Sequence, residues 1–165
     1  MNLTIRTAIP SDYDAIACIT ADAYLGARYF ENVDHPYMRK ILQVAERAAV
    51  AQMIVAERDG AVIGSATLAV YGDEWADVAL PDELEFRLLV VDPAVQRSGA
   101  GRSMVEYILA HAKSLPGINA LSLTTGEDWV SAHALYQRLG FSRAPERDWP
   151  IPENGKMLLV YRMEL

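Results

Sequence analysis

The chain has 165 residues, which is long enough to bury the core of one domain, so we expect residues 1–165 to form a single domain. Hydrophobic residues make up 52% of the sequence and charged residues 22%, a composition that excludes a disordered chain. The formal net charge of −7 argues against a nucleic-acid partner, because such proteins need a basic face that neutralises phosphates.

The sequence also limits the compartment and the metal chemistry. Its apolar runs are far shorter than the ~20 residues that span a bilayer, and its first residues lack the layout of a secretory signal. The single cysteine, Cys18, excludes an internal disulfide. One cysteine and three scattered histidines give no metal-ligand spacing. We therefore expect a cytoplasmic protein that binds no membrane and no metal.

Periodicity predicts alternating strands and helices in the first half of the chain. In chain order the patterns predict a strand at residues 3–8, a helix at 13–24, a helix at 37–49, and strands at 53–57 and 61–70. The last two strands flank Asp59-Gly60, which is a strong signal for a β-hairpin turn.

The second half continues the same mixture. The patterns predict an exposed connection at residues 71–82, a strand at 84–91, a helix at 101–115, a strand at 121–125, a helix at 129–139 and a final strand at 156–164. This order predicts an α/β domain in which helices flank a central mixed sheet.

A glycine-rich turn follows the predicted strand at residues 84–91 and leads into a helix. Glycines let the backbone approach an anion closely, and the helix dipole favours negative charge at this end, while Arg97 and Arg102 add cationic donors. A dinucleotide fingerprint would need a third glycine, and a triphosphate loop would need a lysine where Arg102 stands. The alternative is that these glycines only make a turn.

Two motifs in this order resemble the GNAT superfamily of N-acetyltransferases. Gln96, Gly99 and Gly101 fill the fixed places of its pyrophosphate loop, and the later Tyr136-x-x-x-Gly140-Phe141 resembles the helix of that superfamily that ends in a Tyr-x-x-x-Gly-Phe sequence. The resemblance implies a mostly antiparallel mixed sheet, acetyl-CoA as co-substrate, and direct transfer of its acetyl group to a primary amine. The acceptor would be a small molecule, a peptide or a protein, and homodimers are common in the superfamily. The alternative function is a non-catalytic acyl-CoA-binding sensor or assembly module.

The resemblance also assigns residues to the cofactor. The end of the strand, Leu89, Val90 and Val91, would bond the pantetheine arm and the thioester carbonyl through its backbone. The pyrophosphate would lie on the loop formed by Gln96, Arg97, Ser98, Gly99, Ala100, Gly101 and Arg102. Tyr136 occupies the position of a tyrosine near the coenzyme sulfur, where its phenol would protonate the leaving thiolate. Packing of Tyr136 in the core is a second interpretation, compatible with the first.

Glu85 is the candidate general base, because some members of the superfamily carry a base glutamate six residues before the strand end. Strand periodicity puts Glu85 on the same face as Val91, at the reactive end. The alternative role for Glu85 is an ion pair with Arg87. Glu127 and Asp128, at the end of the next strand, are further candidates that would act through water.

One position departs from the pattern. Trp129 stands seven residues before Tyr136, where many members carry an asparagine that contacts the coenzyme. The acceptor side of the fold is expected to hold aromatic and acidic residues, among them Trp75, Asp77 and Trp149, which suit a cationic amine.

Overall fold

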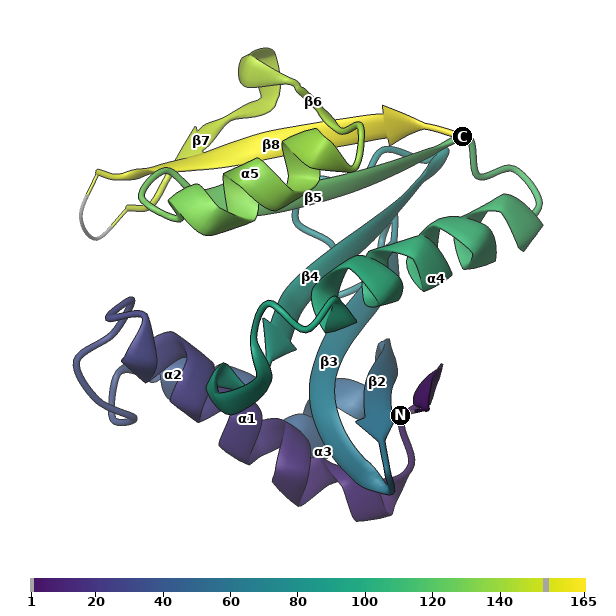
Figure 1. The fold of residues 1–165 in the computed structure, drawn as a ribbon. Helices are drawn as coiled ribbons and strands as arrows, with labels where there is room; N and C mark the ends of the chain where they lie inside the picture. Colours follow the sequence, from purple (N-terminus) through teal and green to yellow (C-terminus); the bar gives the residue numbers. More distant parts are fainter. Residues whose placement is uncertain (1, 153–154) are drawn as a thin grey trace. The chain divides into compact units, whose positions relative to one another are not determined.

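The computed structural model describes residues 2–152 and 155–165 and has the mixed order of helices and strands shown in Figure 1. The described chain divides into two compact units. Unit 1 contains the residues up to Leu68 together with Leu88–Tyr107, and unit 2 contains Ala69–Arg87 together with Ile108–Leu165.

The strands are β1 (Leu3–Thr7), β2 (Gln52–Arg58), β3 (Ala61–Val70), β4 (Glu83–Val91), β5 (Ala120–Gly126), β6 (Ser142–Arg143), β7 (Trp149–Pro150) and β8 (Met157–Glu164). The α-helices are α1 (Tyr13–Gly26), α2 (Pro36–Ile41), α3 (Val44–Ala48), α4 (Ala100–Ser114) and α5 (Val130–Arg138). Short 3-10 turns lie at η1 (Pro10–Asp12), η2 (Pro93–Val95) and η3 (Pro145–Arg147).

The strands are hydrogen-bonded in the order β1-β2-β3-β4-β5-β8-β6, with β7 paired to β8. The β4–β5 pair is parallel, whereas β1–β2, β2–β3, β5–β8, β6–β8 and β7–β8 are antiparallel. This arrangement confirms the predicted α/β class with a mixed, mostly antiparallel sheet. The hairpin turn at Asp59-Gly60 is confirmed too, since the φ angles of 52° and 80° are those of a type I′ turn.

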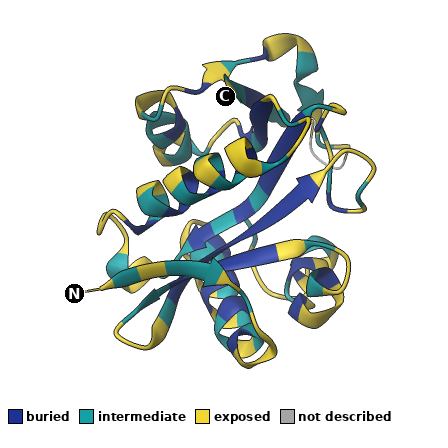
Figure 2. Cartoon of the chain, turned by 90° about the vertical axis from the view of Figure 1, so that its right-hand side faces the viewer, coloured by how far each residue is buried: buried dark blue, intermediate teal, exposed yellow. Residues whose placement is uncertain are grey.

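The strands of unit 1 carry packing layers on both faces. On one face, Ile16 of α1 and Val44 of α3 pack with Met53 and Val55 of β2. On the other face, β3 approaches the first turns of α4 at Gly64. The helix α4 buries a single stripe and exposes the opposite side, as its alternating colours in Figure 2 show. This two-sided burial explains why the middle of β3 is buried at every residue rather than at alternate ones.

In unit 2 the two faces of the sheet differ in chemistry. Along β4, Leu84 and Phe86 alternate with Glu83 and Glu85, and all four are buried. The register pairs Leu84 with Leu121 and Glu85 with Ser122, so one face is apolar and the other carries charges. The apolar face, with Phe86 and Tyr161, packs on α5, and we call it the aromatic face. The opposite face, which carries Glu83, Glu85 and Arg162, is called here the ionic face.

Three predicted features are corrected. The single helix expected over residues 37–49 is two short helices, α2 and α3, because Gln43 (φ −79°, ψ 73°) leaves the helical region between them. The connection at residues 71–82 is not wholly exposed, since the apolar side chains of Trp75 and Ala79 are buried. The short strands β6 and β7 were not predicted, because two-residue strands carry no periodicity.

Candidate functional site

Asp92, the first residue after β4, joins the start of the segment that leads into the glycine-rich loop to the neighbouring strand β3. The Asp92 N–H donates to the Ile63 carbonyl of β3 (2.8 Å). The Asp92 carboxylate accepts the Ala94 N–H (2.9 Å), and its carbonyl accepts the Val95 N–H (2.9 Å), which forms η2. The side chain of Asp92 therefore fixes the exit of the chain from β4.

The backbone of the loop has two positive φ angles within three residues. Arg97 and Gly99 have positive φ angles of 64° and 86°, on either side of Ser98, and all three residues are exposed. Alternation of this kind forms the concave nests of N–H groups that bind anions. The helix α4 follows at once, with Ser103 donating to the Gly99 carbonyl (3.0 Å), and the earlier N–H groups of its first turn have no partner within the helix. The loop and the helix start together form a geometry suited to phosphate.

The side chains around the loop are held in different ways. The Gln96 amide donates to the Val91 carbonyl (3.4 Å), which ties the loop to the strand end. Arg102 is exposed and pairs with Glu106 one turn later (2.9 Å). Ala100 is buried, and Gly101 is half-buried. Of the predicted strand-end residues, Val90 is buried, whereas Leu89 and Val91 are half-buried.

Gly64 of β3 lets the strand end and the loop helix come close together. A Cβ atom at this position would lie 2.9 Å from Met104 Sδ of α4 and 3.0 Å from the Val90 carbonyl oxygen of β4. A side chain here would therefore push apart the two elements that position the loop.

The predicted motif Tyr136-x-x-x-Gly140-Phe141 is a helix end with a definite geometry. The Phe141 N–H donates to the Tyr136 carbonyl (3.0 Å), and the Gly140 N–H donates to the Gln137 carbonyl (3.1 Å). These two bonds form a Schellman motif, which needs a left-handed residue where Gly140 has a φ of 97°. The rings of Tyr136 and Phe141 complete it with a contact between centroids of 5.8 Å.

Tyr136 lies in a cluster of aromatic rings on the aromatic face of unit 2. Its ring centroid is 6.0 Å from Phe86 and 6.1 Å from Tyr161, in addition to the contact with Phe141. The residue is 7% exposed, so most of the ring is enclosed. The cluster fixes the direction of the phenol, which a proton donor needs as much as a core residue does.

Trp129 precedes α5 and packs on the end of β5. Its indole lies so close to Gly126 that a Cβ there would be 2.8 Å from Trp129 Cε2. The Gly126 carbonyl accepts the Trp129 N–H (3.0 Å) and lies 2.8 Å from His133 Nε2. The departure from the superfamily pattern is thus accommodated by a glycine.

Glu85 is fully buried on the ionic face and held by one of its two oxygens. Its Oε1 accepts the backbone N–H groups of Val78 (2.8 Å) and Ala79 (2.9 Å). Among the described residues, its Oε2 has no hydrogen-bond partner, and neither has the buried Oγ of Ser122 on the neighbouring strand. Buried oxygens without partners are uncommon and point to a site where water or substrate binds.

Burial raises the pKa of the Glu85 carboxyl, and the hydrogen bonds from the backbone of Val78 and Ala79, with the charge of Arg87, offset only part of that rise. A raised pKa moves a carboxylate toward the range in which it can accept a proton from an amine. The guanidinium of Arg87, the predicted alternative partner, donates to the Trp75 carbonyl (3.1 Å) and pairs with Asp77 (3.1 Å).

The strand β4 does not keep the alternation that would place Glu85 on the same face as Val91. Leu88 has a positive φ of 54°, so the period of two that starts at Glu85 is interrupted before Val91. A shared face for these two residues therefore does not follow from the strand pattern. The candidates Glu127 and Asp128 are both exposed, and Asp128 pairs with Lys156.

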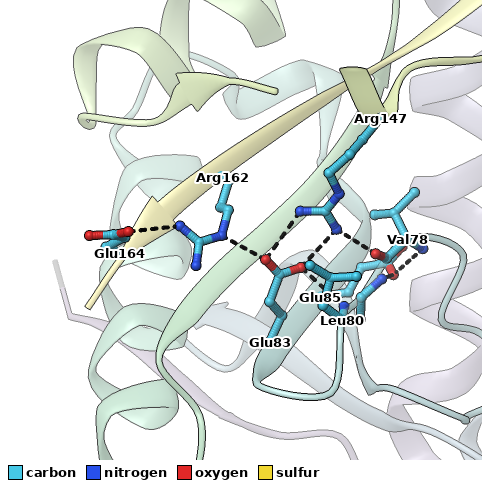
Figure 3. A network of polar contacts seen from close by, with 8 residues as sticks. Val78, Leu80, Glu83, Glu85, Arg147, Arg162 and Glu164 are labelled. Atoms are coloured by element: carbon cyan, nitrogen blue, oxygen red, sulfur yellow. Dashed lines mark hydrogen bonds and ion pairs between the residues drawn. The ribbon is translucent and has the colours of Figure 1, made fainter. Parts of the chain in front are cut away.

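Glu83, two residues before Glu85, is the centre of an ion-pair network that the sequence did not reveal (Figure 3). Its carboxylate accepts hydrogen bonds from Arg147 Nη2 and Nη1 (2.8 and 3.1 Å), from Arg162 Nε (2.7 Å) and from the Leu80 N–H (3.1 Å). Burial by itself would raise the pKa of Glu83, but the hydrogen bonds from Arg147, Leu80 and Arg162 outweigh it and hold the pKa below its ordinary value. Glu83 is therefore an anion in the folded protein.

A cleft of about 480 Å³ opens in unit 2 beside this network. It is lined by Asp77, Val78, Arg147 and Trp149. Asp77 and Trp149 were predicted on the acceptor side, whereas Arg147 was missed. A sequence signal for such a network is present in β4. Charged residues that alternate with apolar ones on a buried strand need partners, as in Glu83-Leu84-Glu85-Phe86-Arg87.

Among the helices of residues 2–152 and 155–165, none has the length and apolarity needed to cross a bilayer. Over the same residues, no group of three or more His, Cys, Asp or Glu side chains is placed to hold a metal ion.

The sequence matches the model of the acetyltransferase (GNAT) family over residues 16–141. It is 31% identical to the mycothiol acetyltransferase of Cellulomonas flavigena over 152 residues, which cover 86% of this chain and 41% of that protein. It is 35% identical to the mycothiol acetyltransferase of Geodermatophilus obscurus over 78 residues, covering 44% of this chain and 25% of that protein. The chain thus spans less than half the length of the curated relatives it matches.

Solved structures show the same fold. The ribosomal-protein-alanine N-acetyltransferase of Brucella melitensis superposes with a TM-score of 0.74 at 20% identity, covering 98% of this chain and 99% of that one. A Salmonella typhimurium protein described as an acetyltransferase, solved with its cofactor acetyl-CoA, superposes with a TM-score of 0.73 at 22% identity, covering 100% of this chain and 95% of that one.

Proposed function

Because this chain belongs to the acetyltransferase (GNAT) family, we propose that it transfers the acetyl group of acetyl-CoA to a primary amine. The observation that carries the catalytic part is Glu85, a fully buried carboxyl group with one oxygen fixed by two backbone donors and the other without a partner among the described residues. A merely structural carboxylate would be expected to use both oxygens.

The cofactor would bind to unit 1 through backbone atoms. The pyrophosphate would accept the N–H groups of residues 97–102, where the positive φ angles of Arg97 and Gly99 and the start of α4 favour an anion. Gln96 would keep the loop on the strand end, and Arg102 would add a positive charge. The backbone of residues 89–91 would bond the pantetheine arm and the thioester carbonyl. Acetyl-CoA in the structure of the Salmonella typhimurium protein supports this choice of co-substrate.

The chemistry needs one proton acceptor and one proton donor. The neutral amine attacks the thioester carbonyl carbon, a C–N bond forms, and the C–S bond breaks. Glu85 would take the proton that the nitrogen loses, directly or through one water on its Oε2. The Tyr136 phenol would give a proton to the departing thiolate.

The test is a thiol-release assay with acetyl-CoA over polyamines, aminoglycosides, amino acids and peptides with a free N-terminus. We expect Glu85→Gln to lower kcat/KM about 10²-fold or more and to remove the acidic limb of its pH profile. We expect Tyr136→Phe to lower kcat by a similar factor while the dissociation constant of acetyl-CoA stays within twofold. The proposal fails if acetyl-CoA does not raise the unfolding temperature at saturation, or if Glu85→Gln acts with the wild-type profile.

The acceptor class we propose is a cationic amine. Its cleft would be the one in unit 2, where Asp77 supplies negative charge and Trp149 an aromatic face. The relatives act on different partners, as the names mycothiol acetyltransferase and ribosomal-protein-alanine N-acetyltransferase state, so they support an acetyltransferase more than any one acceptor.

We propose further that residues 1–165 act as one domain, which the family match across residues 16–141 supports. We also propose a homodimer, because homodimers are common in the superfamily. We propose a cytoplasmic location because the chain has a single cysteine and so forms no internal disulfide.

A further inference from the structure

We propose that Arg147 is a positioning residue that orients the Glu85 carboxylate through the peptide unit between Val78 and Ala79. This inference rests on the proposed function only for the role of Glu85 as the base. The contacts themselves belong to unit 2 and are drawn in Figure 3.

The two ends of one peptide unit make the connection. Its carbonyl, that of Val78, accepts a hydrogen bond from Arg147 Nη2. Its N–H, that of Ala79, donates to Glu85 Oε1 (2.9 Å). Because the carbonyl and the N–H of a peptide unit are rigidly opposed, a donor that fixes the carbonyl also fixes the direction of the N–H. Hydrogen bonds in such a chain also polarise one another, so the cation strengthens the donor that faces Glu85.

Arg147 is itself held by more than this contact. Its guanidinium donates to both oxygens of Glu83 (2.8 and 3.1 Å), and Glu83 in turn accepts the Leu80 N–H (3.1 Å). Arg147 and Glu83 thus hold the segment from Val78 to Leu80 at both ends, and this segment supplies the two donors of Glu85. The flat, forked guanidinium can make these contacts at once, which an ammonium group cannot.

The arrangement leaves Glu85 with a defined reactive oxygen. With Oε1 fixed by two N–H groups, the partnerless Oε2 is the oxygen that can accept a proton. If the peptide unit rotated, Oε1 would lose the Ala79 donor that favours the charged form, and the carboxyl would become harder to ionise. Among the described residues, the titratable and charged groups around Glu85 are Glu83 and Arg87 on β4, Asp77 in the preceding segment, Arg147 on η3 and Arg162 on β8.

Arg162 offers a matched control for this proposal. It also donates to Glu83 (2.7 Å), but it does so from β8, and it pairs there with Glu164 (3.2 Å). Replacing Arg162 removes a cation from Glu83 and leaves the Val78 carbonyl with its Arg147 donor. A difference between the two arginines therefore reports on the peptide unit rather than on the charge of the network.

The experiment is a carbon-13 NMR titration of the side-chain carboxyl of Glu85 in the free protein, with its signal assigned from Glu85→Gln. We expect Arg147→Ala to raise the Glu85 pKa by about one unit, the loss of one hydrogen bond to a charged group, and Arg162→Gln to change it by less than about 0.3. Arg147→Lys, which keeps the charge and is closer in shape, should still raise the pKa by about half a unit. The Arg147→Lys variant also tests the proposal if Arg147→Ala does not fold.

Equal shifts in Arg147→Ala and Arg162→Gln, no shift in either, or a wild-type pKa in Arg147→Lys would overturn the proposal. The titration uses no substrate, so it separates this inference from the proposed function. If the Glu85 pKa moves as expected while the acidic limb of kcat/KM stays in place, Glu85 is not the base, and its positioning by Arg147 stands.

Discussion

Replacing Gly64 by alanine tests how closely β3, the end of β4 and α4 are packed in unit 1. The added Cβ would lie 2.9 Å from Met104 Sδ, 3.0 Å from the Val90 carbonyl oxygen and 3.6 Å from Ala56 Cβ. The thioether of Met104 can move at low cost, but the Val90 oxygen belongs to the strand backbone. Overpacking of this kind costs about 1–3 kcal/mol, which in a protein of this size lowers Tm by roughly 2–12 °C.

The measurement is thermal unfolding followed by circular dichroism, with acetyl-CoA affinity measured by calorimetry. We expect Gly64→Ala to weaken acetyl-CoA binding as well, because Val90 and Met104 lie on the two elements that carry the loop. Gly26→Ala is the control, since a Cβ at this helical position meets nothing within 4 Å, and alanine there should stabilise the helix by up to about 1 kcal/mol. A Gly64→Ala variant with the Tm of the wild type would refute the close approach.

Two further predictions concern unit 2. Gly140→Ala should lower the stability by about 1–2 kcal/mol, because the φ of 97° is unfavourable for a side chain, whereas the added Cβ would lie at an ordinary contact distance of 3.6 Å from Met163 Cε. An unchanged denaturation midpoint would contradict the Schellman geometry. Glu83 should make the protein acid-sensitive, because its pKa is lower in the folded than in the unfolded state. Its contribution to the free energy of unfolding is fully present above the unfolded pKa of about 4.5, and it is lost as the pH falls through the folded pKa. Urea unfolding of Glu83→Gln should therefore show a weaker dependence on pH below about 4.5 than the wild type, and an identical dependence would exclude the ion pairs as its source.

The parts of the fold that the sequence predicted correctly are those specified by local backbone chemistry. Asp59-Gly60 fixes a hairpin because its two residues tolerate positive φ, and Gly140 ends α5 for the same reason. The turn before α4 belongs to this class too, since the positive φ angle of Gly99 lies where the sequence predicts a glycine-rich turn. Such features depend on a few adjacent residues, which a single sequence displays.

The features that the sequence did not predict depend on contacts between distant residues. Glu83 pairs with Arg147 and Arg162, which lie 64 and 79 residues further along the chain. The residues next to each arginine in the sequence do not distinguish it from an arginine on the solvated surface. The break between α2 and α3 was missed because the apolar spacing of Met38 and Ile41 continues past Gln43, whose backbone leaves the helical region.

The geometry of unit 2 also changes how the two proposed catalytic residues can act together. Tyr136 lies on the aromatic face with Phe86, whereas Glu85, the neighbour of Phe86 in β4, lies on the ionic face. Groups on opposite faces of a continuous sheet cannot both reach one reacting centre. Within unit 2, however, the parallel ladder of β4 and β5 ends at the rung of Glu85 and Ser122, while β5 goes on to Gly126. The proton acceptor and the proton donor of unit 2 can therefore meet one substrate only beyond that last rung, where the pairing of β4 with β5 has ended.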